Sequence, residues 1–114
     1  MKNLLLLLLL ILLTSNVYAN SLTKEEFKKA MSFFNSEIIQ ALDESQNFHR
    51  QGQTYLMNMK SCEVLQLHKA KIKVAEENIQ HYKTDYAFQK ELSQDKSYIS
   101  AMGSALKQVG LNCD

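Results

Sequence analysis

Residues 22–52, LTKEEFKKAMSFFNSEIIQALDESQNFHRQG, carry the clearest folding signal in this chain. Thr23 occupies the position of a helix N-cap, and Glu26 follows three residues later, as in a capping box. Apolar residues then recur along one helical face: Phe27, Met31, Phe34, Ile38, Ala41 and Phe48. Gly52 is a residue type at which helices commonly end. This stretch therefore predicts a long amphipathic helix that ends near Arg50.

A second apolar stripe begins after Gly52 and becomes regular over residues 64–83, which predicts a second helix from about Val64 to Lys83. Its positions are Leu65, His68, Ile72, Ala75, Ile79, Tyr82 and Tyr86. A single helix over residues 53–92 would be about 60 Å long, which exceeds the dimensions of a compact domain of this size. We therefore expect a break in this helix, either near residues 61–62 or near residues 84–85.

A third stripe predicts the last helix, with Ser93 or Asp95 as its N-cap. The apolar positions of this helix are Tyr98, Ile99, Met102, Ala105, Leu106 and Val109. Gly110 then occupies the place of a left-handed C-terminal residue, and Leu111 can fold back onto Leu106 as in a Schellman motif.

The composition agrees with a fold made of helices alone. The chain has no proline and three glycines, whereas folds built from strands need many turns and the residues that form them. We expect one domain over residues 20–114, an all-α antiparallel bundle of three to four helices with short connections.

Two cysteines, Cys62 and Cys113, predict one disulfide that staples this bundle. An even number of cysteines in a small exported protein is typical of a bridge. The turn predicted at Gly110 also directs Cys113 back towards the helices. The alternatives are a bridge between two chains, or a redox or metal-bound thiolate, although the Cys-x-x-Cys spacing typical of those sites is absent.

Residues 1–19 have the pattern of a signal peptide. A basic residue precedes an unbroken apolar run from Leu4 to Leu13, and Val17 and Ala19 stand at the two positions that a signal peptidase reads. The run is shorter than the roughly 20 residues that a spanning helix needs. We expect cleavage after Ala19 and export of residues 20–114 to a bacterial periplasm or out of the cell, without membrane insertion.

The charge of the chain is balanced. There are 13 Lys and Arg residues against 12 Asp and Glu residues, and removal of Lys2 with the leader makes the two numbers equal. A balanced charge provides no long-range attraction to nucleic acid or anionic lipid. The single basic cluster, residues 68–73, is followed by Glu76 and Glu77. We therefore expect a solvated helix face there and no nucleic-acid partner.

No pattern predicts a cofactor, a metal site or a catalytic site. None of His49, His68 and His81 has Glu three residues before it, as a di-iron helical bundle requires. Glu77 and His81 are one helical turn apart, but two ligands alone do not define a metal site. No serine and histidine form a nucleophile motif, and we expect both cysteines to be consumed in the disulfide. The protein is therefore expected not to be an enzyme.

We expect this small exported protein to act without catalysis, by binding another protein as an inhibitor, an immunity factor or an accessory subunit. Two alternatives remain open at this point. One is a periplasmic chaperone with an apolar groove, and the other is a helical bundle that binds a metal or another ligand.

Tyr82, Lys83 and Tyr86 form the candidate partner-binding site. Helical spacing predicts the two tyrosines one turn apart on one face of the second helix, with Lys83 between them. Tyrosine offers a large apolar area, little side-chain entropy to lose and a hydroxyl that tolerates water, which suits an interface. The competing interpretation is that both tyrosines close the core of the bundle.

Overall fold

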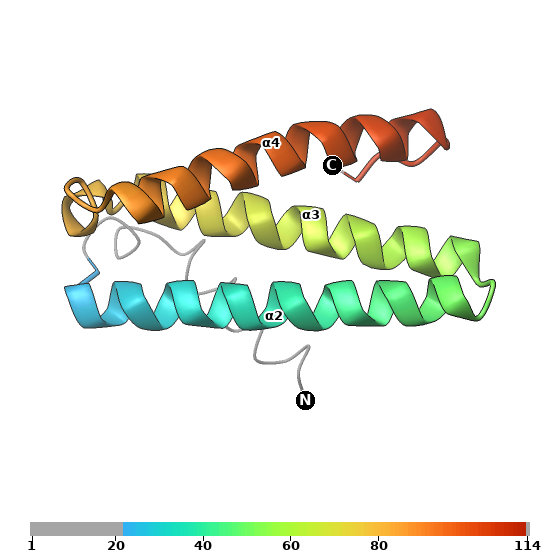
Figure 1. The fold of residues 1–114 in the computed structure, drawn as a ribbon, viewed down its shortest axis with the longest axis horizontal. Coiled ribbons are helices and arrows are strands. Elements are labelled where there is room, and N and C mark those ends of the chain that lie inside the picture. Colours follow the sequence, from blue (N-terminus) through green and yellow to red (C-terminus); the bar gives the residue numbers. More distant parts are fainter. Residues whose placement is uncertain (1–21, 114) are drawn as a thin grey trace.

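The computed structural model describes residues 22–113, and all the regular secondary structure within them is helical (Figure 1). Helix α2 spans Lys24–Arg50, α3 spans Thr54–Glu76 and α4 spans Tyr86–Gln108, while the short 3-10 helix η2 covers Ile79–His81. No strand occurs among these residues. The predicted all-α class is confirmed, with three α-helices. The predicted signal peptide lies outside the described residues.

Helix α2 begins and ends where its sequence predicts. The Thr23 hydroxyl accepts a hydrogen bond from the Glu26 backbone N–H at 3.1 Å, and the Thr23 backbone N–H donates to the Glu26 carboxylate at 2.9 Å. This reciprocal capping box satisfies two donors that the first helical turn leaves free. After Arg50 the chain turns through Gly52, whose φ of 71° lies in the left-handed region that glycine enters most easily.

Helix α3 is continuous through Cys62 and ends at Glu76, so the prediction of a helix reaching Lys83 is wrong. The fully buried Asn78 provides the physical reason. Its side-chain amide donates to the Val74 carbonyl at 2.9 Å and accepts from the Leu22 backbone N–H at 3.3 Å. These bonds connect the end of α3 to the segment before α2, and the chain makes its turn between Glu77 and Asp85.

Helix α4 starts earlier than its sequence predicts. Its N-cap is Asp85, whose carboxylate accepts from the Phe88 backbone N–H at 3.0 Å. The prediction of Ser93 or Asp95 as the cap is wrong, because both lie inside α4 and Asp95 is buried. Aspartate is common both as an N-cap and as the partner of a buried cation. The sequence alone therefore does not distinguish the two roles.

The C-terminal end of α4 confirms the predicted Schellman motif. Gly110 has a φ of 83°, its backbone N–H donates to the Lys107 carbonyl at 3.0 Å, and the Leu111 backbone N–H donates to the Leu106 carbonyl at 2.9 Å. These two bonds satisfy carbonyls that the last helical turn leaves free. The turn brings the C-terminal segment back along α3, where Cys113 bonds to Cys62.

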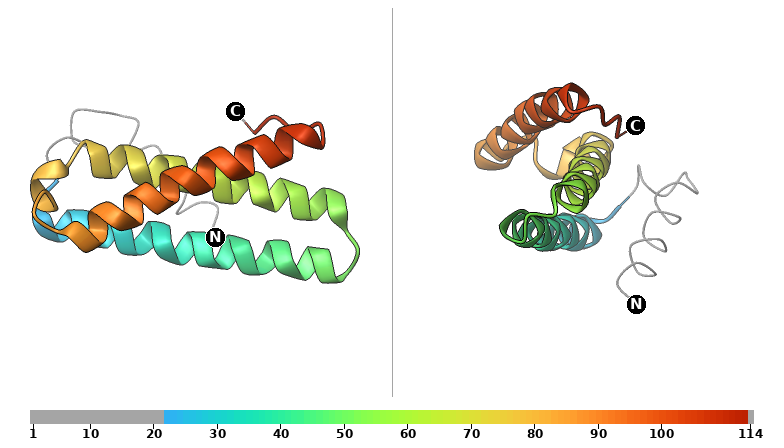
Figure 2. Two further views of the ribbon diagram at one scale, coloured as in Figure 1. Left: turned by 45° about the horizontal axis from the view of Figure 1, so that its top comes forward. Right: turned by 90° about the vertical axis from the view of Figure 1, so that its right-hand side faces the viewer.

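The three helices form an antiparallel α2–α3 hairpin with α4 crossing over α3 (Figure 1). Viewed end-on, α3 lies beside both other helices, whereas α2 and α4 are separated over much of their length (Figure 2). The apolar core lies mainly between α2 and α3: Phe27, Met31, Phe34, Ile38 and Ala41 from α2, and Val64, Leu67, Ile72, Val74 and Ala75 from α3. In contrast, α4 buries only Leu92, Asp95 and Leu106.

Candidate functional site

A groove between the start of α2 and the start of α4 is the candidate binding site, and we call it the aromatic groove. It has a volume of about 400 Å³. Its lining residues are Phe27, Lys28, Met31, Ser32, Asn35, His81, Tyr82, Asp85, Phe88 and Glu91. The groove exists because α4 packs on α3 and contacts α2 only sparsely.

Three aromatic rings form one wall of the aromatic groove. The Phe27 and Tyr82 rings stack with their centroids 5.8 Å apart, and Phe88 meets Phe27 edge-on at 5.8 Å and Tyr82 at 4.7 Å. Such offset and edge-to-face contacts stabilise aromatic pairs beyond the area they bury. Burial raises the pKa of the Tyr82 hydroxyl, and the nearby Glu76 carboxylate raises it further. Tyr82 therefore stays a neutral part of this wall.

The three residues predicted as the partner-binding site do not share one helical face. Tyr82 follows η2 and is buried, Lys83 is exposed in the following turn, and Tyr86 is the first residue of α4 with 80% of its surface exposed. The predicted placement on helix two is wrong because α3 ends at Glu76. Tyr82 thus belongs to the core, while Tyr86 is exposed at the surface at the start of α4.

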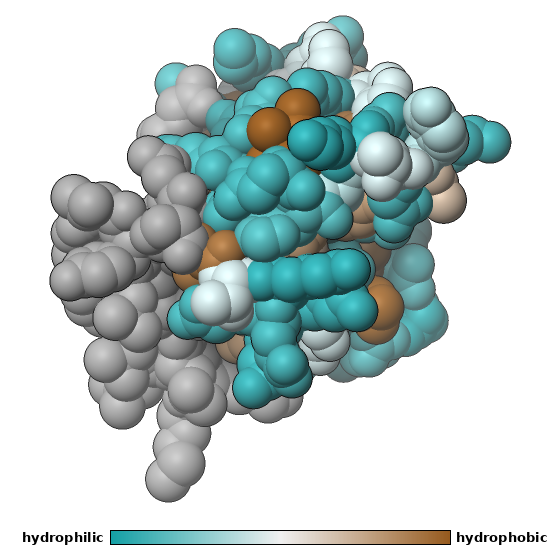
Figure 3. All heavy atoms as spheres, turned by 90° about the vertical axis from the view of Figure 1, so that its left-hand side faces the viewer, coloured by the Kyte–Doolittle hydropathy of each residue, from teal (hydrophilic) through white to brown (hydrophobic). Residues whose placement is uncertain are grey.

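The end of the molecule that carries these residues is mostly hydrophilic. Figure 3 looks onto this end, where α2 begins and α3 connects to α4, and apolar residues appear there only as small separate patches. Ile79 and Tyr86 are its large exposed side chains, with 58% and 80% of their surfaces accessible. Any apolar recognition at this end therefore depends on a few side chains.

Hydrogen bonds to the segment before α2 fix the base of the aromatic groove. The His81 ring donates from Nε2 to the Leu22 carbonyl at 2.6 Å, and Asn78 binds the Leu22 backbone N–H. The His81 ring also lies 5.6 Å from the Phe27 ring. Because His81 binds a backbone carbonyl, its role in this structure is to position the entry of α2 rather than to pair with Glu77.

A cluster of charged and polar side chains lies between α3 and α4, apart from the aromatic groove. We call it the interhelical charge cluster, and its members are Lys71, Glu91, Asp95 and His68. The Lys71 ammonium lies 2.7 Å from a Glu91 oxygen and 2.7 Å from an Asp95 oxygen, and its side chain is only 3% exposed. His68 Nδ1 is 3.4 Å from the other Asp95 oxygen. Burial lowers the pKa of His68, the Asp95 carboxylate opposes this shift, and the Lys71 ammonium adds to it.

The expectation of a solvated face over residues 68–73 is wrong for Lys71, which is buried and pairs with both carboxylates, although the sequence holds a signal for this cluster. Lys71 lies on the apolar stripe of α3, one residue before Ile72, and Glu91 and Asp95 are one helical turn apart on α4. A lysine inside one apolar stripe and two carboxylates spaced along another favour a buried ion pair between the helices. His68, which lies on the same apolar stripe, is buried as well.

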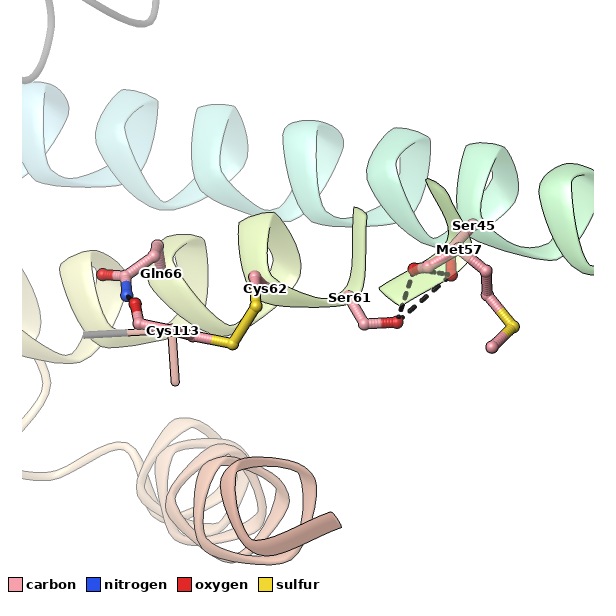
Figure 4. Close-up of a disulfide and its surroundings, with 6 residues drawn as sticks. All are labelled: Ser45, Met57, Ser61, Cys62, Gln66 and Cys113. Carbon is pink, nitrogen blue, oxygen red and sulfur yellow. Dashed lines mark hydrogen bonds between the residues drawn. A yellow bond between two sulfur atoms is a disulfide. The ribbon is translucent and has the colours of Figure 1, made fainter. Parts of the chain in front are cut away.

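The disulfide between Cys62 and Cys113 is present, as predicted, with Cα atoms 5.3 Å apart (Figure 4). Figure 4 shows Gln66, one turn further along α3, reaching the Cys113 carbonyl, to which its side-chain amide donates. On the hairpin side, the Ser45 hydroxyl donates to the Met57 carbonyl at 3.2 Å. The far end of α4 is therefore attached to α3 by a covalent bond and a hydrogen bond.

Within residues 22–113, no three His, Cys, Asp or Glu side chains come together in a group that could hold a metal ion. Over the same residues, every helix is too short or too polar to cross a lipid bilayer.

Comparison of the chain with protein-family models, curated proteins and solved structures finds no match.

Proposed function

We propose that the protein acts without catalysis, by binding another protein in the aromatic groove. The observation that carries this proposal is an open groove of about 400 Å³ whose wall is aromatic, with the exposed Tyr86 next in the chain to the lining residue Asp85. Pockets lined by aromatic side chains, next to an accessible tyrosine, are typical of the centres of protein interfaces. An inhibitor, an immunity factor or an accessory subunit would use such a site.

The charges around the aromatic groove favour one kind of occupant. Lys28 lies on the α2 side, whereas Asp85 and Glu91 lie on the α4 side. An amphipathic helix of the partner would place an apolar ridge against the partly exposed Phe88, acidic residues towards α2 and basic residues towards α4. Opposite charges across an interface steer association and fix the orientation of the bound helix.

Two exposed tyrosines make a matched test of this proposal. Tyr86 follows the groove residue Asp85 in the chain, whereas Tyr55 lies at the other end of the hairpin, in the first turn of α3, with 70% of its surface exposed. A photo-crosslinking phenylalanine analogue at position 86 should give one adduct of defined mass in producing cells. The same analogue at position 55 should not.

Variants then test the chemistry of the contact. Tyr86→Ala and Lys28→Glu should each weaken capture of the crosslinked partner, while Tyr55→Ala should leave it unchanged. All three side chains are exposed, so the helical circular dichroism should not change. Full capture by both Tyr86→Ala and Lys28→Glu would reject the groove as the site. A broad ladder of adducts would instead support the chaperone alternative.

We also propose that the chain is exported, with residues 1–19 as a cleaved signal peptide. The apolar run before Ala19 supports this proposal. The Cys62–Cys113 disulfide is compatible with an oxidising compartment.

A further inference from the structure

The face of α2 that lines the aromatic groove continues beyond it. Lys28, Ser32 and Asn35 line the groove and follow one another at intervals of four and three residues, so they lie on one face of the helix. Ile39 comes four residues after Asn35 and shares this face. One face of α2 therefore carries residues of the groove and then an isoleucine.

Ile39 is accessible to a partner. Its surface is 67% exposed, whereas Phe27, Phe34 and Ile38 of the same helix are buried. Single exposed apolar residues are common on protein surfaces. Ile39 differs from such a residue in its position, because it lies one helical turn beyond a residue of the groove.

The spacing between the groove and Ile39 matches the repeat of a second helix. Ser32 and Ile39 are seven residues apart, which is about 10.5 Å along α2 at a rise of 1.5 Å per residue. A helix that lies alongside α2 has the same rise. When one of its residues meets the groove at Ser32, the residue seven positions away meets Ile39.

We propose that the partner's helix extends past the aromatic groove along α2 and covers Ile39 with a second apolar residue, seven positions from the one that enters the groove. This extended contact rests on the proposed binding function and defines the sequence pattern of the partner. Helices that bind in grooves commonly use apolar residues at such an interval.

Asn35 sets a further requirement between the two apolar positions. It lies on the same face, between Ser32 and Ile39, and carries an amide into the lining of the groove. An apolar side chain over this amide would remove its hydrogen bonds to water without replacing them. The partner therefore needs a polar residue three or four positions from its first apolar residue, and a helix with an unbroken apolar stripe fits poorly.

The charges along α2 select the direction of the bound helix. Lys28 stands at the groove end of this face, and the exposed Asp43 lies one turn beyond Ile39. Acidic residues of the partner near Lys28 and basic residues near Asp43 complement these charges. Because acidic residues favour the start of a helix and basic residues favour its end, the bound helix is expected to run parallel to α2.

Photo-crosslinking in producing cells tests this proposal, with the protein crosslinked at position 86 as the probe. The phenylalanine analogue at position 39 should give an adduct of the same mass as the analogue at position 86. Position 109 is the control, because Val109 is a similarly exposed apolar residue, 63% accessible, at the far end of α4. The analogue there should give no adduct.

Variants then test the chemistry of the extended contact. Ile39→Lys should weaken capture of the probe protein by about tenfold or more, because the burial of an apolar side chain is lost. Ile39→Leu should retain capture, and Val109→Lys makes the same chemical change outside the contact and should have no effect. Asn35→Leu should weaken capture because it removes the partner of a polar residue. Ile39 and Val109 are exposed, so the helical circular dichroism of their variants should not change.

The outcomes separate this proposal from the proposed function. An adduct at position 86 without one at position 39, or full capture by Ile39→Lys, would overturn the extended contact and leave the groove as the binding site. Stronger capture by Asn35→Leu would contradict the polar spacing. Adducts with the mass of two copies of this chain would assign the face to self-association and overturn the proposal. An adduct at position 39 alone, or at neither position, would reject the proposed binding function and the extended contact together.

Discussion

Removal of the Cys62–Cys113 disulfide should lower the free energy of unfolding. The size of this loss depends on the length of the chain segment that the bridge closes. The bridge closes a segment of 51 residues. Chain-entropy reasoning gives about 4 kcal/mol for a loop of that length, and measured values are typically about 2 to 4 kcal/mol. This is a large fraction of the roughly 5 to 15 kcal/mol by which small domains are stable.

The loss is expected to be concentrated in α4. This helix buries only Leu92 and Leu106 among its apolar residues, and the bridge is the covalent attachment of its far end. The variant with both Cys62→Ala and Cys113→Ala should therefore melt at a lower temperature, by roughly 8 to 30 °C. Exchange of the α4 amides should accelerate before that of the α2 amides.

Thermal unfolding followed by circular dichroism measures this effect, and the same measurement after reduction of the native protein provides the comparison. Reduction should reproduce the melting temperature of the double cysteine variant, and reductant should not change the variant itself. An equal melting temperature for the oxidised protein, the reduced protein and the variant would refute the reasoning. It would mean that helix packing alone restrains the C-terminal segment.

Three further predictions follow from single sites. Intact mass or N-terminal sequencing of the exported protein should show cleavage after Ala19, and a retained leader would contradict the signal-peptide assignment. The pKa of His68 lies below its usual value of 6.5 because of burial, so unfolding binds a proton and stability falls as the pH drops from about 6.5 towards the folded-state pKa. Chemical denaturation of His68→Gln should show a flatter pH dependence over that range, and an unchanged slope would exclude this histidine as its source. Tyr82→Ala should lower the free energy of unfolding by about 3 kcal/mol or more because the ring is buried. Tyr86→Ala should change it by no more than about 0.5 kcal/mol. Equal losses for the two variants in urea titrations would be evidence against the assigned burial.

Local signals in the sequence predicted the features of the fold that depend on a few neighbouring residues. Thr23 and Glu26 define the start of α2 because a capping box needs only those two side chains and their backbone. Gly110 marks the end of α4 for a similar reason, since the left-handed turn depends on that residue and its near neighbours. The disulfide followed from the presence of only two cysteines.

The end of α3 could not be predicted in the same way. No glycine or proline stands near Glu76, and the helix stops where Asn78 forms hydrogen bonds to Val74 and to the distant Leu22. That contact exists only once α2 has packed against α3. The candidate binding site was misplaced by the same error, because Tyr82 and Tyr86 share a helical face only if α3 continues through them.

The interhelical charge cluster also has a consequence for how α4 finds its register on α3. Leu92, Ile99 and Leu106 recur at intervals of one heptad, so a slip of α4 by two turns would again place a large apolar residue at each of the shared positions. Apolar packing alone therefore distinguishes poorly between the two registers. A slip would, however, move Asp95 away from Lys71 and leave both charges buried without partners, which typically costs several kcal/mol. We therefore expect the ion pair between Lys71 and Asp95 to select one register of α4 on α3.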